Sequence, residues 1–159
     1  MEQSISPGLR FSLLHRSFKK KMDETLSEKE LTGVQFGVLA TLVRLERETE
    51  DEISQRALEE RTHLSHPTMT EIIKHLEKKG FLRCETSSRD RRFKSISATE
   101  KAYRLGQEVK AVEEETFSWL CRGLAEEQAA QLIAITDVML QNAIQSLESC
   151  TKGSADCCD

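Results

Sequence analysis

Apolar residues in the first third of the chain recur every three or four positions, which is the period of an amphipathic helix. The pattern predicts a helix from Gly8 to about Lys29 with apolar positions Leu9, Leu13, Leu14, Phe18, Met22 and Leu26. A second helix follows Thr32, a predicted N-cap, and carries a buried stripe of Val34, Val38, Leu39, Leu42 and Leu45. A short strand near Ile53 and a third helix over about residues 54–61 complete this region.

A fourth helix is predicted in the stretch SHPTMTEIIKHLEKKG, residues 65–80. Ser65 is a suitable N-cap, Pro67 lies in the first turn where its missing N–H costs nothing, and Gly80 is a C-terminal stop signal. Two short strand candidates, FLRCE and KSISA, follow on either side of a polar loop over residues 86–93. Two helices joined by a turn and followed by a hairpin are typical of a winged helix-turn-helix.

The last third of the chain predicts two long helices. Thr99 is expected to cap the first, which Gly123 ends, and the second runs from about Glu126 to Leu147. Their apolar faces, with that of the first helix, exceed what a small winged helix can cover, and an identical subunit is the simplest partner. The predicted dimerisation residues are Leu9, Leu13, Phe18, Leu105, Val109, Val112, Leu120, Leu132, Leu140 and Leu147.

The expected fold class is therefore mainly α: a winged helix-turn-helix with a small antiparallel wing sheet and long N- and C-terminal dimerisation helices. Residues 1–31 form the N-terminal dimerisation helix, 32–100 the winged helix-turn-helix domain, and 101–148 the C-terminal dimerisation helices. Residues 149–159 are polar and small and are expected to be a disordered tail. No apolar run is long enough for a membrane span, and the N-terminus has no signal-peptide core, which favours a cytoplasmic protein.

Charge is distributed unevenly along the chain. The formal net charge of the whole is −4, yet residues 63–94 contain eight Lys and Arg against four Asp and Glu. A basic middle in an acidic chain indicates a surface that faces a polyanion.

Three segments resemble the MarR family of bacterial transcriptional regulators. They are DRRFKSISATEK, which resembles the family's wing signature, LTGVQFGVL, and LSHPTMTEIIKHLEKKGFL, which resembles the recognition helix and its exit. The resemblance implies a dimer joined through the first, fifth and sixth helices that binds a pseudopalindromic operator in double-stranded DNA. It also implies repression relieved by a small-molecule effector or by oxidation, with an effector pocket lined by the first, second and fifth helices. The chain departs from the family pattern at Glu71, where a basic residue is frequent, and at Ala125, where a serine cap is frequent.

The predicted DNA contacts fall into two groups. In the wing, Arg92 is the candidate for insertion into the minor groove, with Asp90 aiming its guanidinium and Arg89, Arg91 and Lys94 on phosphates. On the fourth helix the candidates are Ser65, His66, Thr68, Thr70, Glu71 and Lys74. Threonine methyls can touch thymine, and hydroxyls can bond base edges or phosphates. Lys74 is expected on a phosphate, and Glu71 either accepts from cytosine or orients a neighbour.

Two other functions are compatible with the sequence. A thiol- or metal-responsive regulator would use Cys121 or the tail cysteines Cys150, Cys157 and Cys158, although adjacent cysteines lack the usual ligand spacing. A winged helix can also serve protein–protein contact alone. No catalytic motif, metal-ligand set or cofactor-binding loop occurs, so neither an enzyme nor a cofactor is expected.

The wing hypothesis predicts that Arg92→Ala weakens operator binding by about 1–3 kcal/mol, the scale of one well-placed nucleic-acid contact. Thermal stability should be unchanged, because an arginine in a polar loop supports little core. Binding titrations on the operator and on random DNA measure the effect. Operator binding equal to that of the wild type would make the loop a solvated turn.

Overall fold

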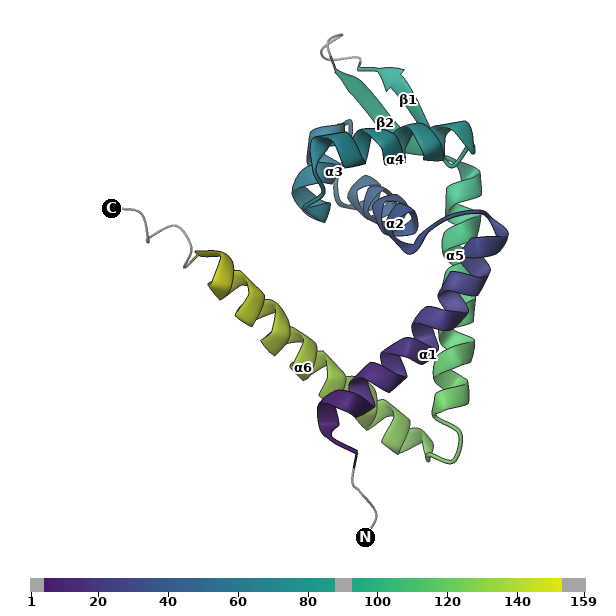
Figure 1. Cartoon of the computed structure of the whole chain (residues 1–159), viewed down its shortest axis with the longest axis vertical. Helices are drawn as coiled ribbons and strands as arrows, with labels where there is room; N and C mark the ends of the chain where they lie inside the picture. The colour runs from purple at the N-terminus through teal and green to yellow at the C-terminus, as the bar shows by residue number, and fades with distance from the viewer. Residues whose placement is uncertain (1–4, 88–92, 153–159) are drawn as a thin grey trace. The chain divides into compact units, whose positions relative to one another are not determined.

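The computed structural model describes residues 5–87 and 93–152, which form six helices and one hairpin (Figure 1). One compact unit ends at Phe117 and a second begins at Ser118. The elements are α1 Pro7–Glu28, α2 Gly33–Glu48, α3 Gln55–Thr62, α4 His66–Lys78, β1 Leu82–Thr86, β2 Lys94–Ala98, α5 Glu100–Leu120 and α6 Glu126–Lys152. The mainly helical winged-helix fold class is confirmed.

The predicted helix starts are set by local hydrogen bonds. Thr32 forms a full capping box: its hydroxyl accepts from the Gln35 amide at 3.3 Å, and the Gln35 side chain accepts from the Thr32 amide at 2.9 Å. Ser54 caps α3 through the Ala57 amide at 3.3 Å. Ser65 occupies the N-cap position of α4 but makes no side-chain cap, because its hydroxyl pairs with that of Thr68 at 2.8 Å.

The core of the first unit lies between α2, α4 and the hairpin. Leu39, Leu42, Leu76 and Phe81 are each at most 2% exposed, and burying such side chains contributes about 1.5–3 kcal/mol apiece. Most of the predicted α2 stripe is confirmed, but Val34, in the first turn of α2, is 56% exposed.

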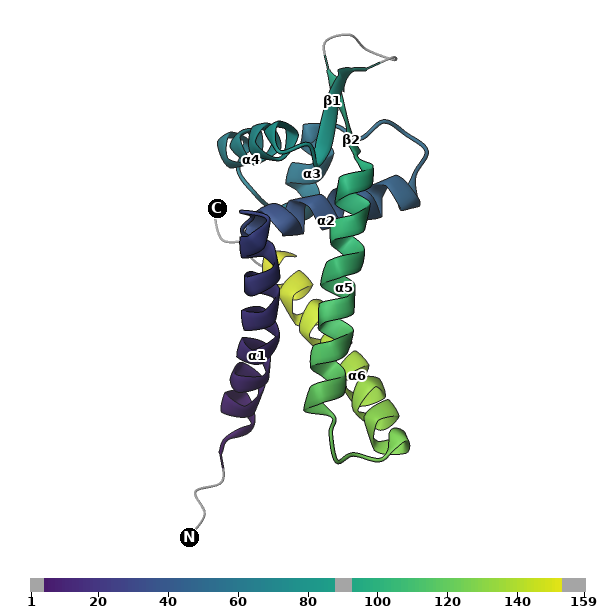
Figure 2. The ribbon, with the colours of Figure 1, turned by 90° about the vertical axis from the view of Figure 1, so that its right-hand side faces the viewer.

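The hairpin pairs β1 with β2 in antiparallel register, with Cys84 opposite Ile96 (Figure 2). A two-stranded hairpin is marginally stable by itself, and this one is held by burial of Leu82 and Ile96. The backbone carbonyl of Ile53 accepts from the Ile96 amide at 2.8 Å. The structure has no strand at Ile53, where the sequence led us to expect one, but this residue does pair with β2 through one backbone hydrogen bond.

Glu46 joins α2 to both the hairpin and α5. One carboxylate oxygen accepts from the Ala98 amide at 2.7 Å, and the other accepts from the Tyr103 hydroxyl at 2.6 Å. Thr99, the predicted cap of α5, instead donates its hydroxyl backward to the carbonyls of Gly80 at 2.7 Å and Phe81 at 3.1 Å. Glu46 and Thr99 therefore attach the start of α5 to α2 and to the segment between α4 and β1.

The long helices differ in two ways from expectation. Leu105 and Val109 are 2% and 3% exposed in the single chain, because α5 packs them into the core, and a partner cannot cover them. The last helix continues to Lys152, so residues 149–152 are helical. Among the described helices none is long and apolar enough to cross a membrane.

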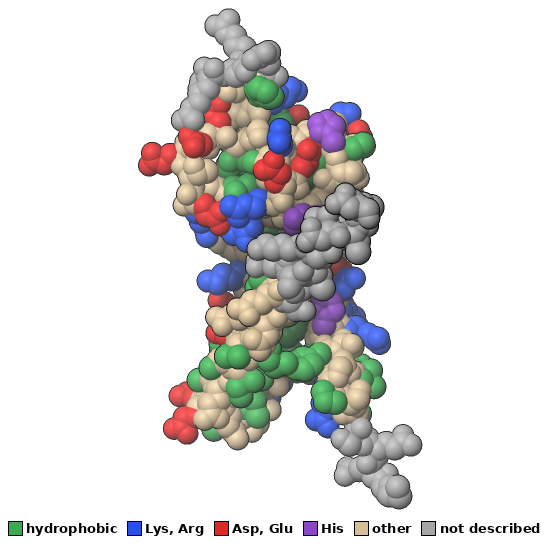
Figure 3. All heavy atoms as spheres, turned by 90° about the vertical axis from the view of Figure 1, so that its left-hand side faces the viewer, with side chains coloured by type: hydrophobic (Ala, Val, Ile, Leu, Met, Phe, Trp, Pro, Cys, Tyr) green, Lys and Arg blue, Asp and Glu red, His purple; other side chains and the backbone are tan. Residues whose placement is uncertain are grey.

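The other predicted dimerisation residues remain accessible where their side chains are described. Leu9, Leu13, Leu132 and Leu140 are between 39% and 60% exposed. Phe18, Val112 and Leu120 are half-buried, and the side chain of Leu147 lies outside the described part. Figure 3 shows hydrophobic side chains gathered on the surface of the long helices.

The Glu46 contact predicts an unusual titration for Tyr103, the single tyrosine of the chain. The pKa of Tyr103 is raised by its hydrogen bond to Glu46, then by burial and by the carboxylate charge. Because the folded protein holds this proton more tightly than the unfolded chain, the stabilisation is full below about pH 10 and is lost as the pH rises further.

Tyrosinate absorbance should give a midpoint above the ordinary value of about 10 in the folded protein. In denaturant the midpoint should return to that value, and Glu46→Gln should lower it in the folded state. A folded-state midpoint at the ordinary value would show that the contact does not form in solution.

Candidate nucleic-acid interface

Helix α4 presents a polar face because its apolar residues all turn toward the core. The buried side chains are Met69, Ile72, Ile73 and Leu76. Five of the predicted contact residues are exposed, namely Ser65, His66, Thr68, Glu71 and Lys74, and Thr70 is half-buried. The structure therefore places these predicted residues on α4, with Ser65 at its N-cap.

A groove of about 830 Å³ separates α4 from the hairpin. Ile73 and Ile96 form part of its apolar wall, while Lys74 and Lys94 line it from opposite elements. Two predicted phosphate contacts, twenty residues apart in the chain, thus border one hollow. The remaining wing candidates, Arg89, Asp90, Arg91 and Arg92, lie outside the described residues.

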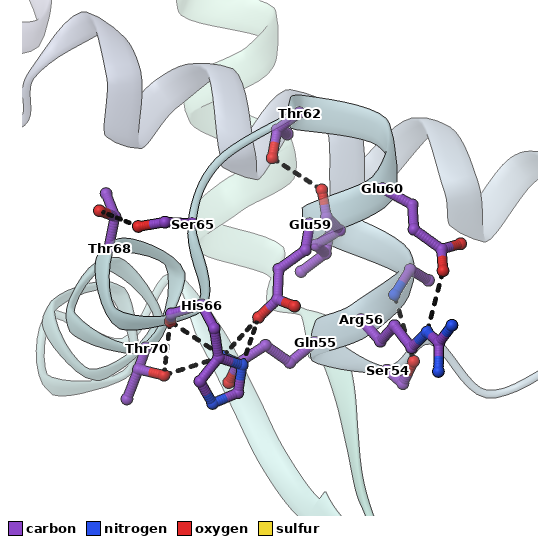
Figure 4. Close-up of polar contacts among 12 residues, drawn as sticks. Ser54, Gln55, Arg56, Glu59, Glu60, Thr62, Ser65, His66, Thr68 and Thr70 are labelled. Carbon is purple, nitrogen blue, oxygen red and sulfur yellow. Dashed lines mark hydrogen bonds and ion pairs between the residues drawn. The ribbon is translucent and has the colours of Figure 1, made fainter. Parts of the chain in front are cut away.

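Gln55, at the start of α3, organises the inner flank of α4 (Figure 4). Its side-chain amide nitrogen lies 2.8 Å from the Glu59 carboxylate and 2.8 Å from the Thr70 hydroxyl oxygen. The Thr70 hydroxyl donates to the His66 carbonyl at 2.9 Å. Sequence reasoning missed Gln55 and Glu59, because only the fold places α3 against this part of α4.

Glu59 also sets the hydrogen-bonding state of His66. The His66 Nδ1 atom lies 2.8 Å from a Glu59 carboxylate oxygen, whose side chain is 19% exposed while that of His66 is 75% exposed. An ionised carboxylate only accepts, so Nδ1 carries the proton. The second ring nitrogen, Nε2, points away from Glu59 (Figure 4).

Glu71 and Lys74 form an ion pair on the outer face of α4. Their charged atoms are 2.9 Å apart and both side chains are well exposed, at 73% and 66%. Exposed pairs of this kind contribute about 0–1 kcal/mol, so Lys74 remains free to exchange Glu71 for another anion. Glu71 accordingly has an intramolecular partner, which supports its predicted orienting role over direct base contact.

The far end of α4 is fastened to the connection between α1 and α2. Lys79 donates to the Glu30 carbonyl at 2.9 Å and to its carboxylate at 2.7 Å, and the Lys79 side chain is only 18% exposed. The hydrogen bond and charge of Lys79 hold the pKa of Glu30 below its ordinary value. These contacts fix the C-terminal end of α4 against the residues that follow α1, so a movement of α1 would change the orientation of α4.

The two cysteines with described side chains, Cys84 and Cys121, form no disulfide. Burial and the neighbouring Glu77 raise the pKa of Cys84 to about 11, so it is a thiol at neutral pH. Cys121 is half-buried and unpaired, and the structure describes no side chain of the tail cysteines. Within the described ranges no group of three or more His, Cys, Asp or Glu residues could hold a metal ion.

Residues 29–92, from the end of α1 into the wing, match the family model described as MarR family. The matched segment contains α2, α3, α4 and β1, the elements that build the polar face and its groove. Over these residues the winged-helix domain is similar to the MarR family. The match confirms the resemblance carried by the recognition helix and the preceding segment, and it ends at the third residue of the wing segment.

Solved structures extend the likeness of the MarR-family domain to the long helices. MepR of Staphylococcus aureus, a transcription regulator of the multidrug efflux pump MepA, is 22% identical with a TM-score of 0.72. That match covers 87% of this chain and 99% of MepR. YusO of Bacillus subtilis is 23% identical with a TM-score of 0.70, covering 84% of this chain and 92% of YusO. At these identities the likeness establishes a shared fold.

A third structure is a MepR–DNA complex from Staphylococcus aureus. It is 22% identical to this chain with a TM-score of 0.68, and the match covers 84% of this chain and 96% of that protein. The fold of the present chain therefore also occurs in a protein solved on DNA.

Proposed function

We propose that this protein is a DNA-binding transcriptional repressor whose α4 enters the major groove of double-stranded DNA. The observation that carries the proposal is the polar face of α4 beside the groove shared with the hairpin, bordered by Lys74 and Lys94. A helix with its N-terminal residues exposed is the part that such domains insert among base edges. The family match and the MepR–DNA complex support the same reading.

Within this proposal the predicted residues divide by chemistry. Lys74 and Lys94 contact phosphates and fix the register of the protein on the duplex. His66, Thr68 and Thr70 lie where base edges are read, with Ser65 at the helix start. Arg92 enters the minor groove, aimed by Asp90, while Arg89 and Arg91 contact phosphates. The protein acts by binding in the cytoplasm and not by catalysis.

We infer that the active form is a homodimer on a pseudopalindromic operator. The isolated chain leaves large apolar residues exposed on α1, including Leu9, Phe11, Leu13 and Leu14. On α6 the exposed set comprises Leu132, Ile133, Ile135, Val138, Met139, Leu140 and Ile144. Exposed large apolar residues gathered on one helix mark an interaction site, and a second copy supplies matching helices by symmetry.

A pocket of about 520 Å³ between α1 and α5 is our candidate for the effector site. Phe18, Met22 and Phe117 form its apolar wall, with His15 and Lys19 at polar positions. Residues of α2 do not line it, in contrast to the expectation from the family. An aromatic or amphipathic small molecule suits this lining, and occupation would alter the separation of the two helices that flank it.

The proposal predicts that Lys74→Ala weakens binding to operator and random DNA alike. Loss of one phosphate contact lowers the slope of log affinity against log salt by about 1 per subunit. Fluorescence anisotropy at several salt concentrations measures this slope on both DNAs.

Lys110→Ala is the matched control, since Lys110 is an exposed lysine paired with Glu114 on α5. It should leave both the affinity and the slope unchanged. Equal behaviour of the two variants would contradict the phosphate contact of Lys74. No binding of DNA by the wild type would favour a winged helix used for protein contact only.

The dimer proposal predicts that the double substitution Leu9→Glu and Leu13→Glu lowers the mass of the particle from two chains to one. Both side chains are exposed in the isolated chain, at 50% and 42%, so the charges should act on association and not on the core. Light scattering at micromolar concentration gives the mass. Val34→Glu, an equally exposed apolar position on α2, should remain dimeric, and a monomeric wild type would contradict the proposal.

A further inference from the structure

Thr70 has two chemically different groups that could read DNA, a hydroxyl and a methyl. A threonine hydroxyl bonds base edges or phosphates, whereas its methyl makes an apolar contact with the C5 methyl of thymine. Which group is available depends on what the hydroxyl already bonds inside the protein. The contacts between α3 and α4 settle that question.

The hydroxyl of Thr70 already uses its one proton and one of its two acceptor lone pairs inside the protein. Its single proton bonds the His66 carbonyl at 2.9 Å, an atom that can only accept. Its oxygen in turn accepts from the Gln55 side-chain amide at 2.8 Å. Donating this proton to a base would break the bond to the His66 carbonyl, and rotating the side chain toward the DNA would also break the bond from Gln55, at the usual desolvation cost.

Glu59 fixes the orientation of the Gln55 amide. The Gln55 group that faces Thr70 also lies 2.8 Å from a Glu59 carboxylate oxygen, which only accepts, so this group is the NH₂ and not the carbonyl oxygen. The NH₂ has two protons, and the two shortest contacts take one each. In Figure 4 the Thr70 oxygen points to these partners, and its methyl carbon points away from them.

We propose that Gln55 and Glu59 make Thr70 a thymine-reading residue: by holding its hydroxyl against α3, they leave its methyl to contact the C5 methyl of a thymine in the major groove. Gln55 and Glu59 are positioning residues here and do not touch DNA. This inference rests on the proposed function, because it assigns one base contact to the helix that enters the major groove.

The test uses uracil, which pairs as thymine does but lacks the C5 methyl. An operator is first selected from random DNA with the full-length protein, and each thymine of one half-site is then replaced by uracil in turn. The wild type should lose roughly fourfold in affinity at one thymine, the loss expected when one buried methyl contact disappears.

Two substitutions separate the methyl from the hydroxyl. Thr70→Ser removes the methyl, so it should bind thymine and uracil equally at that position. Thr70→Val keeps a methyl in the same place and removes the hydroxyl, so it should retain the discrimination. Thr68→Ser, at a neighbouring exposed threonine whose hydroxyl pairs with Ser65, is the matched control and should leave the Thr70 thymine unaffected.

Gln55→Met tests the positioning role. Without the amide the Thr70 hydroxyl is freed, so the preference for thymine over uracil at that position should fall while the overall affinity changes little. A melting curve for each variant verifies that the domain is folded.

The outcomes separate this inference from the proposed function. If the wild type binds its operator but no uracil substitution weakens binding, or if Thr70→Ser keeps the full discrimination, the thymine contact is wrong and the repressor proposal stands. If Thr70→Val loses discrimination, the hydroxyl reads the base. If Gln55→Met keeps the wild-type discrimination, Gln55 has no positioning role. If the wild type retains no DNA at all, both proposals fail.

Discussion

A hairpin of two five-residue strands is not stable alone in water, so the wing depends on what the helices supply to it. Glu46 on α2 adds a polar contact to the burial of Leu82 and Ile96. Its carboxylate accepts from the last residue of β2 through one oxygen and from Tyr103 on α5 through the other, at 2.7 and 2.6 Å. One side chain thereby sets the base of the wing and the start of α5 against the same helix. The groove beside α4 exists because the hairpin is held at that position.

The polar residues of α4 are held in place by internal partners before any ligand arrives. Gln55 and Glu59 hold the inner flank through Thr70 and His66, and Lys79 holds the C-terminal end through Glu30. Preformed hydrogen bonds reduce the side-chain entropy lost on binding. They also restrict chemistry, because an occupied hydroxyl or carboxylate is not offered to a base. A polar residue of a recognition helix can therefore offer DNA only its apolar part, because its polar atoms are already bonded inside the protein.

Several features could be predicted from the sequence because they depend on neighbouring residues. The starts of α2 and α3 at Thr32 and Ser54 and the turn at Gly80 are local signals, and each lies where expected. The MarR-family resemblance, carried by short segments around α4 and the wing, is likewise a property of contiguous residues. The assignment of Leu105 and Val109 to the dimer interface was wrong. An apolar stripe that faces the core of its own chain has the same helical period as one that faces a partner.

The sequence by itself determined the order of helices and strands, the basic segment over residues 63–94 and the family resemblance of the winged-helix domain. Periodicity, capping residues and charge are readable within a few positions, and the elements follow from them. The tertiary structure decided which polar atoms remain available. Gln55 meets Thr70 across fifteen residues, and Thr99 turns its hydroxyl to Gly80 across nineteen. A hydroxyl bonds whichever acceptor the fold brings within 3 Å, and no local pattern records that distance.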